Sequence, residues 1–150
     1  MKKFKFKFAL VLAKRKEEEQ QALLVFSHKQ RIYQAQISQK EKLILDLQHS
    51  LDRREQLGAQ LVSIFEFHSE QNFIEGTKQR ILQAEHRIFK AYKDLERSHI
   101  RYLDSRKRTK MIESLQDKAT VAFKKERNKY EQKELQDLMI MRFRLKEEVA

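Results

Sequence analysis

The sequence predicts an all-α fold, a long two-helix antiparallel coiled coil that forms a helical hairpin. The chain of 150 residues contains no Pro and only two Gly, the residues that most often interrupt helices and build turns. Charged residues make up 37% of the chain and its mean hydropathy is −0.80, which is typical of long helices with a narrow apolar stripe. The length fits one unit, so we expect a single domain over residues 1–150.

The first helix is predicted over about residues 5–67. Its apolar side chains follow the seven-residue repeat of a coiled-coil seam, at Phe26, Tyr33, Ile37, Ile44, Leu47 and Leu51. Leu61 and Phe65 continue this pattern past Gly58. A glycine inside a helix costs about 1 kcal/mol relative to alanine, so Gly58 predicts a weak point or a tight helix contact and no break.

The turn is predicted at about residues 68–77, where Ser, Asn and Gly76 favour turns and helix caps. A short connection makes the two helices antiparallel. A turn centred near residue 72 pairs each position i with position 144 − i. Phe8 is then expected beside Gln136, and Val11 beside Lys133.

The second helix is predicted over about residues 78–148. Its stripe advances in steps of three and four residues, at Ile81, Ala84, Ile88, Ala91, Leu95, Ser98 and Tyr102. Ser98, Ser105 and Thr109 place hydroxyl groups on this stripe. Polar seam residues weaken packing but fix the register of the helices.

Features that would support catalysis are missing from the sequence, so we expect no enzyme, no cofactor and no metal. Two isolated glycines cannot form a phosphate-binding loop. No two histidines have the i, i+3 or i, i+4 spacing that presents two metal ligands on one helical face; they are His28, His49, His68, His86 and His99. Glu17, Glu18 and Glu19 point in different directions and balance Lys14–Lys16 through helical ion pairs.

The start of the chain imitates a secretory signal, because a basic segment precedes the apolar run Phe8–Ala13. That run is six residues long, shorter than the apolar region of about 7–15 residues that secretion requires. Lys14–Lys16 follow directly in place of a cleavage site. We therefore expect a cytoplasmic protein.

Charge and aromatic residues suggest binding surfaces. The net charge of +11 suits nucleic acid, a membrane surface or an acidic protein, although Arg106–Lys110 reads by default as a solvated basic face. Phe4, Phe6 and Phe8 alternate with lysines, and either meet a partner or pack on the second helix. A second contact is predicted at the turn end, from Phe65, Phe67, Phe73 and Ile74.

Two segments carry a resemblance to a known family. The opening Met1–Phe8, followed by Val11, Leu12 and Arg15, resembles the start of the flagellar export protein FliJ family. The segment Glu131–Leu138, followed by Arg142 and Phe143, is similar to a motif near that family's C-terminus. Phe8 stands where Leu is commoner and Gln136 where Asp is usual.

The resemblance implies a component of the bacterial flagellar type III export apparatus. Members of that family are coiled coils similar to the central stalk of rotary ATPases. The implied partners are a hexameric export ATPase, a membrane export gate and export chaperones. The implied location is cytoplasmic and peripheral at the inner face of the membrane, with the association made through partners.

An antiparallel pairing would bring both motifs to one end of the hairpin as a composite ATPase-binding surface. The expected contributors are Phe4, Phe6, Phe8, Val11, Leu12, Arg15, Glu131, Gln132, Lys133, Leu135 and Arg142. Two alternatives stay open, a periplasmic holdase-type helical chaperone and a basic coiled coil that binds nucleic acid. No specific nucleic-acid motif supports the latter.

Overall fold

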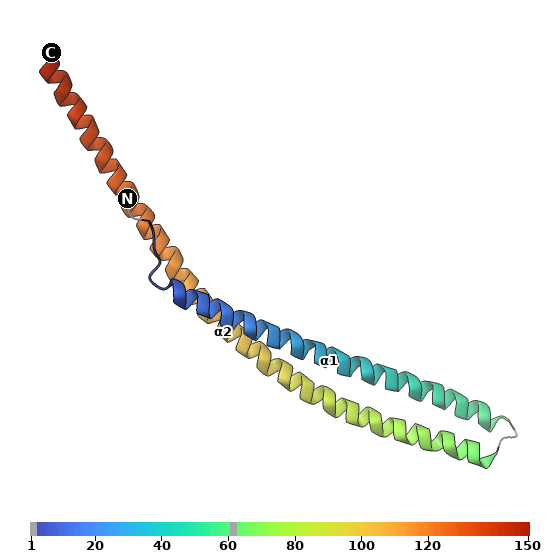
Figure 1. Ribbon diagram of the computed structural model, residues 1–150. Coiled ribbons are helices and arrows are strands. Elements are labelled where there is room, and N and C mark those ends of the chain that lie inside the picture. The colour runs from blue at the N-terminus through green and yellow to red at the C-terminus, as the bar shows by residue number, and fades with distance from the viewer. Residues whose placement is uncertain (1–2, 61–62) are drawn as a thin grey trace. The chain divides into compact units, whose positions relative to one another are not determined.

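The computed structural model describes residues 3–60 and 63–150, which form two long helices. Helix α1 spans Ala9–Gly58 and helix α2 spans Ile64–Val149 (Figure 1). The two helices pack antiparallel, so the predicted all-α helical hairpin is confirmed. Leu61, which the sequence placed on the seam, lies outside the described residues.

The chain divides into two compact units. The terminal unit comprises Met1–Glu19 and Ser105–Ala150, and the turn unit comprises Gln20–Asp104. Each unit contains a segment of α1 and a segment of α2. The expectation of one domain over residues 1–150 stays a prediction, and the two units are described separately below.

In the turn unit, contacts between the helices recur every seven residues along each helix. Ring centroids lie 5.0 Å apart for Phe26 and His99 and 6.0 Å apart for Tyr33 and Tyr92. One heptad further on, the Lys40 ammonium lies 2.9 Å from a carboxylate oxygen of Glu85. This spacing is the register of an antiparallel coiled coil.

The predicted seam of α2 faces α1. Ala84, Ala91 and Ser98 are 1%, 8% and 5% exposed, and Ile81, Ile88, Leu95 and Tyr102 are half-buried. Ile74, which the sequence placed in the turn, also belongs to this seam and is 0% exposed. The apolar stripe predicted for α1 is half-buried as well, from Phe26 to Leu51. The heptad assignment is therefore confirmed from Phe26 to Leu51 and from Ile81 to Tyr102. It was wrong for Phe65, which lies in α2 and is 80% exposed.

The turn prediction was wrong, because α1 ends at Gly58 and α2 begins at Ile64. Ser63 caps α2: its backbone carbonyl accepts the Glu66 N–H at 3.0 Å and its hydroxyl accepts the Phe65 N–H at 3.2 Å. Ser63 and Glu66 have the spacing of a capping box, a helix-start signal that outweighs the turn propensity of residues 68–77.

Both glycines were assigned the wrong role. Gly58 terminates α1, and a Cβ built there would meet no atom within 4 Å, so no tight helix contact exists at this position. Gly76 lies inside α2 and forms no boundary. The neighbouring Thr77 fits the helix because its hydroxyl donates to the Phe73 carbonyl at 2.8 Å.

The earlier turn changes the register of the hairpin. In the turn unit, residue i of α1 contacts the residue of α2 whose number is about 125 − i. For example, the side chains of Arg54 and Gln71 form a hydrogen bond of 3.0 Å. The turn predicted near residue 72 would have paired residue i with residue 144 − i. Consequently each residue of α1 faces a residue of α2 that lies closer to the turn than the sequence predicted.

Candidate functional site

The N-terminal residues of the predicted site split into a packed group and an exposed group. Residues 3–6 form no helix, and the Phe4 ring lies 5.3 Å from the Phe123 ring of α2. Leu12 is 6% exposed and belongs to the seam. Phe8 and Val11 remain 43% and 41% exposed, so these two can be reached by a partner.

Phe6 bridges these two groups. It is half-buried, and its ring lies edge-on to the Phe8 ring at 5.9 Å. The alternation of Phe and Lys thus places Phe4 and Phe6 against protein, while Lys3, Lys5 and Lys7 are all exposed to solvent. Packing on the second helix, one of the two interpretations of this segment, is confirmed for Phe4.

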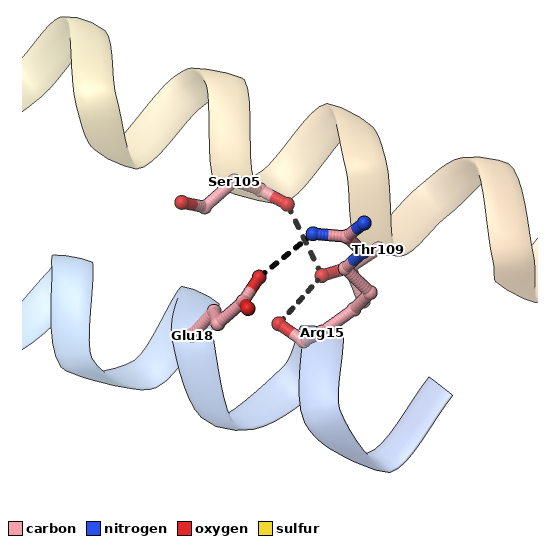
Figure 2. Close-up of polar contacts among 4 residues, drawn as sticks. All are labelled: Arg15, Glu18, Ser105 and Thr109. Carbon is pink, nitrogen blue, oxygen red and sulfur yellow. Dashed lines mark hydrogen bonds and ion pairs between the residues drawn. The ribbon is translucent and has the colours of Figure 1, made fainter. Parts of the chain in front are cut away.

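Arg15 is held by contacts inside the terminal unit (Figure 2). Its guanidinium donates to the Glu18 carboxylate at 2.9 Å. The Thr109 hydroxyl lies 3.1 Å from the Arg15 carbonyl on α1 and 3.1 Å from the Ser105 carbonyl on its own helix, so its single proton is shared. Thr109 is 2% exposed, and this hydroxyl links α1 to α2.

This linkage predicts a measurable stability difference between two threonines. Replacing Thr109 with Val should lower the free energy of unfolding by about 0.5–1.5 kcal/mol, the usual contribution of one hydrogen bond. Thr120→Val is the matched control, because its hydroxyl donates only to Gln116 of its own helix. Urea denaturation followed by helix ellipticity measures both. Equal losses in the two variants would show that the bond between helices contributes nothing.

The C-terminal residues of the predicted site lie on a stretch of α2 without a neighbouring helix. Every residue from 124 to 150 is exposed, and Figure 1 shows no helix beside this stretch of α2. Glu131 pairs with Arg127 of the same helix at 3.4 Å, and Leu135 is 61% exposed. Gln132, Lys133 and Arg142 are exposed as well.

The predicted composite surface does not form, because the two motifs are at different heights. Phe8 was expected beside Gln136 and Val11 beside Lys133. Instead Phe4 contacts Phe123 and Arg15 contacts Thr109, so the segment Glu131–Arg142 lies beyond the start of α1. The cause is the register that follows from α1 ending at Gly58 and α2 beginning at Ile64.

A second apolar stripe on α2 went unrecognised in the sequence. It advances in steps of three and four residues through Leu135, Leu138, Arg142, Leu145 and Val149, with Met139 beside Leu138. Its apolar members are all 59% exposed or more. The heptad frame of the seam continues instead through Lys133, Asp137, Ile140 and Arg144. Two residues of offset correspond to about 200° around a helix, so the new stripe lies opposite the seam.

The move of the apolar stripe to the opposite side of α2 could have been predicted from the sequence. After Tyr130 the seam positions become mostly charged, while leucines appear two residues away from them. Arg142 and Leu135 of the predicted site fall on the new stripe, whereas Lys133 falls on the seam side. The structure therefore separates residues that the sequence grouped together.

Two features are absent from the described residues. Among residues 3–60 and 63–150, no group of three or more His, Asp or Glu side chains could hold a metal ion. Nor is any described helix apolar enough, over a sufficient length, to cross a membrane. The described helices have exposed apolar and charged faces, and such faces are suited to binding.

Comparison with known proteins adds a family. A search of curated proteins found no match, and a search of solved structures found none either. The sequence profile described as Flagellar FliJ protein matches residues 4–148, which is nearly the whole chain and includes both motif segments. The chain therefore belongs to the flagellar FliJ family and is a component of flagellar protein export.

Proposed function

We propose that this protein is a central-stalk-like coiled coil that binds the hexameric export ATPase and couples it to the membrane export gate. Family membership supports a role in flagellar export. The observation that carries the proposal is the apolar stripe of residues 135–149, which no other part of the described chain covers.

The stripe has the properties of a docking face. An amphipathic helix binds a hydrophobic groove through side chains at i, i+3, i+4 and i+7 spacing. Leu135, Leu138 and Met139 begin that series, and Arg142 lies among them as a polar anchor. Arginine and methionine are enriched at protein interfaces, and arginine is among the residues that most often dominate binding energy there.

The N-terminal residues play two parts in this proposal. Phe8 and Val11 are exposed enough to contact the ATPase directly. Phe4, Leu12 and Arg15 instead hold the segment against α2 and so act through its position.

The turn end is the proposed second contact, facing the export gate. Phe65, Phe67 and Phe73 are 80%, 42% and 38% exposed, and the neighbouring Ile64 is 78% exposed. Ile74 is 0% exposed, so it supports this surface from the seam and does not itself face a partner. The Arg80 guanidinium lies 5.7 Å from the Phe73 ring centroid and adds a positive group beside it.

A cytoplasmic location at the inner face of the membrane, reached through these partners, belongs to the same proposal. Handling of export chaperones also belongs to it. Both come from the family and neither depends on the stripe.

A binding experiment tests the ATPase contact. The combined variant Gln132→Ala, Lys133→Ala and Arg142→Ala should retain helicity, because these exposed residues pack against no other helix. It should bind the export ATPase about tenfold to a hundredfold more weakly in a quantitative pull-down, as expected for truncating one anchor and two rim side chains.

The matched control carries three alanines at exposed polar positions of the same segment that belong neither to the predicted site nor to the apolar stripe, Lys129, Asp137 and Arg144. It should bind like the unmodified protein. If the Gln132, Lys133 and Arg142 variant binds equally well, the assignment of these residues is incorrect.

A further inference from the structure

The positive charge of the protein is concentrated in the terminal unit. That unit holds 20 Lys and Arg against 11 Asp and Glu, whereas the turn unit holds 13 against 11. Nine of the eleven net charges therefore belong to Met1–Glu19 and Ser105–Ala150. A charge excess of this kind draws the unit toward polyanions or anionic surfaces.

Two basic segments far apart in the sequence meet in this unit. The hydrogen bond from the Thr109 hydroxyl to the Arg15 carbonyl places Lys14–Lys16 beside Arg106–Lys110. Nearby carboxylates are already engaged, Glu18 with Arg15 and Glu113 with Lys16 at 3.9 Å.

Four other cations of these two segments are free to meet a ligand. In the described part of the chain, Lys14, Arg106, Lys107 and Lys110 are exposed and form no ion pair. We call these four residues the basic cluster. Further along the same unit, Lys3, Lys5 and Lys7 add three exposed ammonium groups.

Exposed apolar side chains accompany these cations. Leu10 is 87% exposed, and Phe8 and Val11 are 43% and 41% exposed. Cations next to exposed apolar residues are the combination that binds the interface of an anionic bilayer, where apolar side chains enter the headgroup region.

We propose that the terminal unit binds anionic phospholipid bilayers directly, through Lys3, Lys5, Lys7 and the basic cluster, with Leu10 entering the interface. Cations spread along helices suit a charged surface better than a small anion, which needs converging donors. Single-stranded nucleic acid fits less well, because it requires aromatic faces free for stacking. Phe4 and Phe6 have ring neighbours at 5.3 and 5.9 Å instead.

Vesicle sedimentation with the full-length protein tests this. In 0.1 M salt, vesicles of phosphatidylcholine with phosphatidylglycerol should bind the protein, and vesicles of phosphatidylcholine alone should not. Each Lys near an anionic surface contributes about fivefold in affinity. The variant Lys3→Gln, Lys5→Gln, Lys7→Gln should therefore bind roughly a hundredfold more weakly.

The control variant neutralises three exposed lysines of the turn unit, Lys42→Gln, Lys78→Gln and Lys90→Gln, and has the same net charge. It should lose less than threefold in affinity. An equal loss in both variants, or equal binding to uncharged vesicles, overturns the proposal.

Two further measurements distinguish binding to a bilayer from binding to other polyanions. Leu10→Gln should weaken vesicle binding severalfold, while Leu82→Gln, which changes a 59% exposed leucine in the turn unit, should not. A single-stranded oligonucleotide that binds more tightly than the vesicles at the same salt, with affinity unaffected by Leu10→Gln, would assign the surface to nucleic acid and overturn the lipid proposal.

Discussion

Replacing Ile74 with Ala is expected to lower the free energy of unfolding by about 2–4 kcal/mol, the range for removing a large buried aliphatic side chain. Ile74 is 0% exposed and is the largest fully buried side chain of the described residues. A two-helix seam contains few such residues, so little other apolar burial compensates for the loss. The effect should appear as a lower urea midpoint in helix ellipticity.

Ile64 provides the matched control for this substitution. It is the same residue type in the same helix and unit, but it is 78% exposed. Ile64→Ala should change the free energy of unfolding by less than about 0.5 kcal/mol, as expected for a surface substitution. If both variants lose the same stability, Ile74 is not the packing anchor of the turn end.

Replacing Leu135, Leu138 and Leu145 together with Gln should weaken binding to the export ATPase several hundredfold. These side chains are 61%, 59% and 61% exposed in the free protein, so each has apolar area left to bury in a complex. Burial of that area contributes about 1–2 kcal/mol per leucine, which amounts to about two orders of magnitude or more for three. Isothermal titration calorimetry would measure the loss.

The control for the leucine stripe replaces three other exposed leucines with Gln. Leu24, Leu45 and Leu82 are 64%, 54% and 59% exposed and belong to the turn unit. This variant should bind the ATPase with unchanged affinity and retain the same helicity. Undiminished binding by the Leu135, Leu138 and Leu145 variant would rule out the apolar stripe as the docking face.

The helices and their seam could be predicted from sequence because the signal is periodic and repeats over many turns. Ile81, Ala84, Ile88 and Ala91 alternate in steps of three and four, and all are buried or half-buried as predicted. A single misplaced residue does not disturb a pattern of that length.

The turn could not be located by composition, because it depends on a few local hydrogen bonds. Gly76 suggested a boundary, but one glycine costs only about 1 kcal/mol in a helix, which packing along the seam outweighs. Ser63 and Glu66 carried the correct signal in their spacing. The predicted composite site depended on the register of the helices. Because the turn was misplaced, the predicted pairing of Phe8 with Gln136 was wrong as well.

The seam also bears on which helices can pair at all. On α2, one heptad position holds the small residues Thr77, Ala84, Ala91 and Ser98, whereas α1 presents larger side chains such as Phe26 and Tyr33. Two copies of α2 brought together along this face would leave voids between small side chains, and two copies of α1 would crowd their rings. Each helix therefore fits the other better than it fits itself, which disfavours α1–α1 and α2–α2 pairing between neighbouring copies.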